Sequence, residues 1–236
     1  MGKFGRFVYV SCWTADTVES IPLWNLYTPD MHGVRLGLPK FPFEKFHYKA
    51  GQFHFEKDVE TYINIESIYN ENKVSIVAEQ PMLIEVEYTD NKKLLFPKVK
   101  KESCENAARK YIEAKNMSEI TNMELSYSFE VLGKFKHKNW EFQKEWRYLL
   151  TSIPMGLQES NPPTFEKQQE YIRRIEDNNL VPPYQRIFLN LDETAINDLE
   201  VVFGPKMSDA EKILAISLLK QFAPNANYRD SVLRIN

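Results

Sequence analysis

The chain is poor in glycine and cysteine, and it has no long apolar run. It contains 8 glycines in 236 residues, about half the usual share, so glycine-rich phosphate loops and repeat arrays are not expected. Its 2 cysteines provide no disulfide framework. The longest nearly apolar run, residues 213–219, is far shorter than the roughly 20 residues that cross a bilayer. No secretory signal opens the chain, so we expect a cytoplasmic protein without membrane contact.

Familiar ligand-binding motifs are also missing. The sequence has no Walker motif, no Rossmann fingerprint and no Gly-x-Ser-x-Gly. Its 4 histidines show no His-x-x-x-His spacing, and no Cys-x-x-Cys occurs, so we expect no metal site. A net charge of −3 provides no overall field that attracts nucleic acid. Two short basic runs, 98–101 and 134–138, still leave nucleic acid open as a partner.

The remaining composition is that of a soluble folded chain, with 43% hydrophobic and 27% charged residues. We expect a single domain over residues 1–236. The fold predicted is α+β, with a mixed, largely antiparallel sheet and flanking helices. Apolar and β-branched runs predict strands at 7–13, 34–38, 82–88, 146–150, 186–189, 199–203 and 228–235. Helical spacing predicts helices within 14–27, at 103–115, at 164–178 and after residue 208.

The helix after residue 208 has a clear start signal. Ser208 and Glu211 have the spacing of a capping box. We expect this helix to bury part of its apolar side chains, namely Ile213, Leu214, Ile216, Leu218, Leu219 and Phe222.

The densest polar and aromatic segment is 140–147, which reads Trp-Glu-Phe-Gln-Lys-Glu-Trp-Arg. In an extended chain, Gln143, Glu145 and Arg147 share one face. A carboxylate there can hold a ribose hydroxyl and stabilise positive charge on the ribose, while the amide orients a nucleophile. Arg147 would keep the carboxylate ionised. The same alternation also occurs in structural ion-pair ladders, so both interpretations stay open.

A second group of candidates lies in residues 11–35. Trp24 and Tyr27 have flat rings that can stack on a ligand, or they can belong to the core. Cys12 would need a histidine base to act as a nucleophile, and none is near in the sequence.

Three blocks together resemble a bacterial family, the domain of unknown function numbered 2971. They are 11–13 with 23–27 and 33–36, then 138–147, and finally 199–206. The middle block is the most specific. Gln143 stands where the family has the first of two glutamates. The family's usual first strand and Asn-Asp-Pro turn have no counterpart, so we expect a shortened chain or a partner that supplies this element.

The resemblance implies a function in phage defence or as a toxin, with a fold and site like those of mono-ADP-ribosyltransferases. Gln143 and Glu145 match the Gln-x-Glu form of that site. On this basis Glu145, Gln143 and Arg147 are the implied catalytic residues, and NAD is the implied substrate. The implied NAD-binding residues are Ser11, Trp24, Tyr27 and Arg35.

Two other classes of function remain open. The chain could be a non-catalytic recognition module, or a subunit of a multi-protein defence system. The partners expected are a protein that supplies the missing N-terminal element or an antitoxin, and nucleic acid as a possible acceptor. A nuclease is less favoured, because no carboxylate spacing demands a divalent metal.

Overall fold

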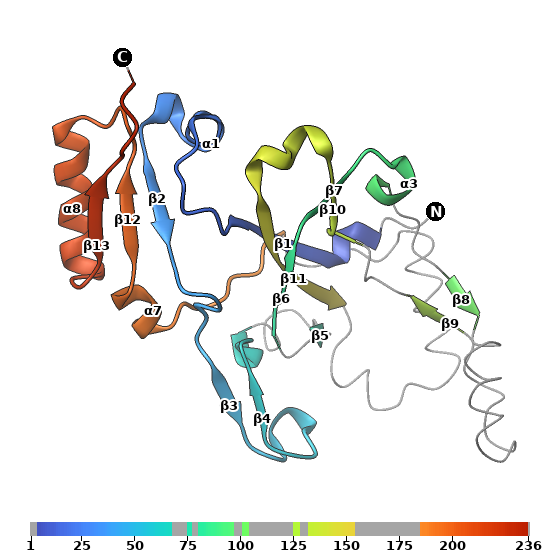
Figure 1. The fold of residues 1–236 in the computed structure, drawn as a ribbon. Coiled ribbons are helices and arrows are strands. Elements are labelled where there is room, and N and C mark those ends of the chain that lie inside the picture. The colour runs from blue at the N-terminus through green and yellow to red at the C-terminus, as the bar shows by residue number, and fades with distance from the viewer. Residues whose placement is uncertain are drawn as a thin grey trace, which may run out of the picture. The chain divides into compact units, whose positions relative to one another are not determined.

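The computed structural model describes residues 4–67, 75–76, 80–96, 101–103, 125–127, 132–153 and 185–235 (Figure 1). The chain forms two compact units. Unit 1 is drawn from Met1–Thr14, Gly51–Glu56 and Ile65–Ile187, and unit 2 from Ala15–Ala50, Lys57–Asn64 and Phe188–Asn236. The single domain expected over the whole chain stays a prediction, because it depends on whether both units unfold together.

Unit 1 is organised around strand β11 (Glu145–Ile153). Strand β1 (Val8–Thr14) pairs antiparallel with it along its whole length, from Val8 opposite Thr151 to Thr14 opposite Glu145. Strands β5 (Ser75–Ile76) and β6 (Met82–Glu85) also pair antiparallel with β11. Tyr148, Leu149 and Leu150 of β11 are buried, as expected for a central strand.

The other elements of unit 1 are short. Strand β7 (Glu87–Thr89) pairs parallel with β10 (Phe135–His137), and β8 (Lys101–Ser103) pairs antiparallel with β9 (Leu125–Tyr127). The short helices are η1 (Phe4–Phe7), η3 (Gln52–His54), α3 (Lys92–Leu95) and η4 (Lys138–Gln143).

Unit 2 contains a three-stranded sheet with β12 (Glu200–Phe203) in the centre. Strand β2 (Val34–Gly37) pairs antiparallel with β12, and β13 (Asn227–Asp230) pairs parallel with it. Helix α8 (Asp209–Phe222) connects β12 to β13 and lies alongside these strands (Figure 1). A long connection of this kind is what a parallel strand pair requires.

The remaining elements of unit 2 complete its core. They are α1 (Ile21–Tyr27), η2 (Pro29–Met31), α7 (Glu193–Asn197) and the antiparallel pair of β3 (Phe46–Tyr48) and β4 (Val59–Thr61). Trp24, Met31 and Val202 form a buried cluster against which Leu233 and Ile235 pack. Helices and mainly antiparallel sheets confirm the α+β prediction.

One prediction about these elements is wrong, and another holds only in part. Residues 186–189 form no strand. The chain makes only an isolated bridge two residues later, between Leu191 and Phe43. Pro42 precedes that bridge and has no N–H to extend a ladder. The capping box of α8 is confirmed, and Ile216 and Leu219 are partly buried as expected, but the other four apolar side chains are exposed. At least half of the surface of four side chains on α8 is exposed, namely Ile213, Leu214, Leu218 and Phe222.

The predicted helix at 164–178 lies outside the described residues, and so does the one predicted at 103–115, apart from its first residue. Within the part that is described, no helix is long and apolar enough to span a membrane.

Candidate functional site

Gln143 and Glu145 lie at the junction between a helix and a strand. Gln143 is the last residue of η4, and Glu145 is the first residue of β11. Lys144 between them has a φ of 43°, in the left-handed region. Gln143 and Glu145 therefore lie on either side of a sharp change in backbone direction. The sequence had predicted that both lie in a strand or in the loop that leads into it.

Both carboxylate oxygens of Glu145 are held by cations. Oε1 accepts a hydrogen bond from Nε of Arg147 at 2.6 Å, and Oε2 accepts one from Nζ of Lys136 at 2.7 Å. Only 3% of the surface of Glu145 is exposed. The carboxylate is thus a buried anion with two charged donors, which is the arrangement that makes burial of a charge tolerable.

The pKa of Glu145 reflects this environment. Burial alone would raise it, but hydrogen bonds from Arg147, Cys12 and Lys136 outweigh burial and lower the pKa to about 2. The carboxyl group is therefore ionised at every physiological pH. This agrees with the expectation that Arg147 keeps it charged, and it adds two donors that the sequence did not indicate.

Gln143 and Glu145 contact the same ammonium group. Nζ of Lys136 donates to the side-chain oxygen of buried Gln143 as well as to Glu145. The same Nζ lies 5.1 Å from the ring centroid of Trp140, within cation–π range. An amide oxygen, a carboxylate oxygen and an aromatic ring thus surround one cation. We call Lys136, Trp140, Gln143, Glu145 and Arg147 the Glu145 cluster.

The backbone around the cluster is also fixed. The hydroxyl of Tyr88 accepts from the backbone N–H of Glu145 at 2.8 Å, and Nη1 of Arg147 donates to the carbonyl of Gly133. Burial raises the pKa of Tyr88, so its hydroxyl stays protonated. These contacts join β7, β11 and the turn before β10 into one rigid arrangement.

Cys12 is adjacent to the cluster but is not activated. It pairs with Arg147 across β1 and β11. Its thiol pKa is raised by burial and by the hydrogen bond and charge of Glu145. A thiol with a raised pKa is a poor nucleophile. Ser11, the neighbouring candidate for NAD binding, is exposed and accepts from Nε1 of Trp13 at 2.9 Å.

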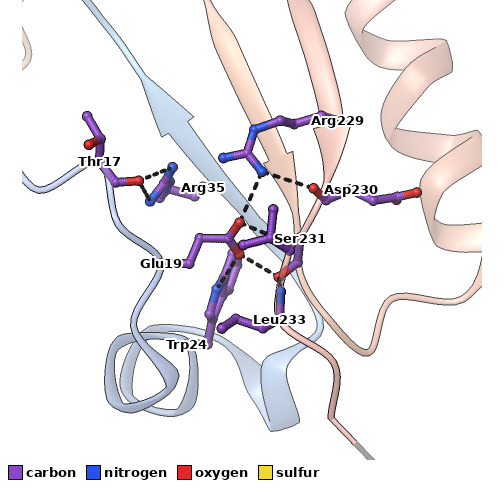
Figure 2. Close-up of polar contacts among 9 residues, drawn as sticks. Thr17, Glu19, Trp24, Arg35, Arg229, Asp230, Ser231 and Leu233 are labelled. Carbon is purple, nitrogen blue, oxygen red and sulfur yellow. Dashed lines mark hydrogen bonds and ion pairs between the residues drawn. The ribbon is translucent and has the colours of Figure 1, made fainter.

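The other candidates for NAD binding belong to unit 2, and Figure 2 shows the contacts of Trp24 and Arg35. Trp24 is buried, and its Nε1 donates to Oε2 of Glu19 at 3.3 Å. Arg35 donates to the backbone carbonyl of Thr17 at 3.2 and 3.3 Å. Tyr27 is 66% exposed on α1. Of the two interpretations of Trp24, a core residue or a ring that stacks on a ligand, the buried position agrees with the core residue.

Glu19 is a second buried carboxylate that the sequence did not indicate. It accepts from Nη1 of Arg229 and from the backbone N–H of Val232, both at 3.0 Å, and from the hydroxyl of Ser231 (Figure 2). Burial would raise its pKa, but these hydrogen bonds together lower it. Glu19 thereby fastens the C-terminal segment after β13 to the loop before α1.

The structure thus groups Gln143, Glu145 and Arg147, while Trp24, Tyr27 and Arg35 lie in the other unit. The assignment of these residues to catalysis or to NAD stays a prediction. Lys136 is the important residue that sequence reasoning missed. It was noted only as part of a basic run, and nothing in its spacing indicates that β10 places it opposite Glu145. Among the described residues, no group of three or more histidine, cysteine, aspartate or glutamate side chains is placed to hold a metal.

Comparison with known proteins identifies the family. A family model described as "Protein of unknown function (DUF2971)" matches residues 23–148. The chain belongs to this family, because the match covers more than half of it. The matched range contains the Trp24 segment and the Glu145 cluster, but not the 199–206 block. No curated protein and no solved structure matches the chain significantly.

Proposed function

We propose that this member of the DUF2971 family works by binding, as a recognition subunit of a multi-protein system in antiviral defence, and that helix α8 carries its contact surface. The observation that supports this proposal is the exposure of large apolar side chains on α8. Ile213, Leu214 and Phe222 are exposed by 64%, 63% and 68%. Neighbouring exposed apolar side chains of this size mark a surface for protein binding.

The helix is apolar on more than one side. Ala215, Ile216 and Leu219, on the opposite side from Leu214, are partly covered. A helix that is apolar all round is normally covered all round. The outward side of α8 therefore has the composition of an interface.

The Glu145 cluster supports a structural role for the residues first considered as catalytic. A carboxylate that stabilises charge on a substrate needs an oxygen directed at that substrate. Both oxygens of Glu145 are bound to cations of the same chain. We infer that the cluster stabilises unit 1 around β11.

Photo-crosslinking tests the binding role. Benzoylphenylalanine at position 214, in cells with and without phage infection, is expected to give a discrete covalent adduct. The control is the same probe at Val18, which is 70% exposed in the same unit but lies outside α8. Equal adducts at both positions, or none at 214, would remove α8 as the contact surface.

A second function, NAD-dependent ADP-ribosyl transfer, is favoured by one observation. Gln143 and Glu145 converge on a single cation beside the ring of Trp140. When the bond between ribose and nicotinamide breaks, positive charge develops on the ribose, and this corner could stabilise it. The ammonium of Lys136 would first have to leave. Its side chain is 23% exposed, so part of it is already in contact with solvent.

A further inference from the structure

The outward side of α8 has the pattern of a helix–helix interface. Ala210, Leu214, Ser217 and Gln221 are exposed and follow one another at intervals of four, three and four residues. This spacing keeps the four residues, of which three are small or apolar, on one seam of the helix. The seam is flanked by exposed Ile213, Leu218 and Phe222. We call these seven residues the α8 outer face.

The rotation of α8 about its own axis is fixed by polar contacts on the other side. Lys212 forms an ion pair with Asp230 of β13 at 2.8 Å. Glu211 accepts from Ser208 in the capping box and contacts Nδ1 of His32 at 3.0 Å. These contacts hold the α8 outer face away from the sheet, so it needs a partner from outside this unit.

The charges beside this face indicate the partner. Asp209 is the first residue of α8, and Lys220 lies about three turns later on the same side of the helix. Neither residue forms an ion pair with any described part of the chain. One helix thus carries a negative charge at its start, which also acts on Lys212, and near its end a positive charge that forms no ion pair with the described residues.

We propose that the α8 outer face binds a second copy of this chain, with the two α8 helices antiparallel about a twofold axis. In that arrangement Asp209 of each copy lies beside Lys220 of the other, because a twofold axis makes each contact occur twice. The helix dipoles also oppose each other favourably. A parallel pair would instead place the two Asp209 residues on opposite edges of the interface, where neither meets Lys220. The inference rests on the proposed binding function and specifies its partner.

Sedimentation equilibrium of the purified full chain tests this pairing. The wild type is expected to dimerise, and Leu214→Glu is expected to be monomeric because it places a charge in the seam. Asp209→Lys and Lys220→Asp should each raise the dimer dissociation constant about tenfold, since each dimer holds two such pairs. The double variant Asp209→Lys/Lys220→Asp should restore dimerisation, which a merely folding-related defect would not do.

Val18→Glu is the matched control and should dimerise like the wild type. A wild type that stays monomeric at all concentrations overturns the inference, as does a double variant that dissociates more than either single variant. If the wild type is monomeric but the probe at position 214 captures a different protein, the binding function stands and self-association fails. If both experiments are negative, the proposed function fails as well.

Discussion

Replacing Glu145 with alanine is expected to lower the free energy of unfolding by about 3 kcal/mol. The change leaves the charges of Lys136 and Arg147 without a counterion, and breaking one partner of a buried ion pair typically costs this much. These cations are only 23% and 13% exposed, so water compensates them poorly. Urea denaturation of the full chain measures the loss.

Glu87→Ala is the matched control for this change. Glu87 pairs with Lys134 at 2.9 Å, but both side chains are largely exposed, so the expected change is below about 1 kcal/mol. Equal losses in the two variants would contradict a structural role for the Glu145 cluster.

Acid provides a second readout of Glu145. Its pKa is lowered from 4.5 to about 2 in the folded chain, so its ionised form stabilises the fold above the unfolded value. That contribution is lost as the pH falls from about 4.5 toward 2. The stability of Glu145→Gln should therefore decline less steeply than that of the wild type over this range.

Gly204→Ala is expected to lower the free energy of unfolding by about 2–3 kcal/mol. This is the high end of the range for forcing an extra atom into a packed site. A Cβ at position 204 would lie 2.3 Å from the carbonyl oxygen of Met31 and 2.9 Å from that of Gly33. Both are backbone atoms that cannot rotate away. The N–H of Gly204 also donates to the carbonyl of Gly33 at 2.8 Å, which fixes the close approach.

Gly5→Ala is the control for this substitution, because a Cβ there meets nothing within 4 Å. Its stability should stay close to that of the wild type in the same denaturation assay. A Gly204→Ala variant as stable as Gly5→Ala would show that the turn after β12 adapts freely, against the geometry described.

The elements that could be predicted from the sequence are those with local signals. Strand β1 is rich in β-branched and aromatic residues, and the mainly apolar and aromatic part of β11 begins at Trp146. The start of α8 follows from Ser208 and Glu211, whose side chains contact each other within one turn. Each of these patterns is decided by residues that are neighbours in the chain.

What could not be predicted depends on residues far apart in the sequence. Lys136 reaches Glu145 because β10 pairs with β7, a segment about fifty positions earlier, and no spacing rule reveals that pairing. The exposed side of α8 was missed for a related reason. Apolar periodicity identifies a face as suited to burial, but it does not say whether the same chain or another molecule covers it.

Release of nicotinamide from NAD by the purified full chain is the most direct test of whether Glu145 is structural or catalytic. The assay compares the wild type with Glu145→Gln, which keeps the shape of the side chain and removes its charge. Because both oxygens of Glu145 are bound to Lys136 and Arg147, we expect both proteins to release no more than a buffer control. Release by the wild type that Glu145→Gln abolishes while remaining folded would contradict the structural role and assign cleavage of the bond between nicotinamide and ribose to Glu145.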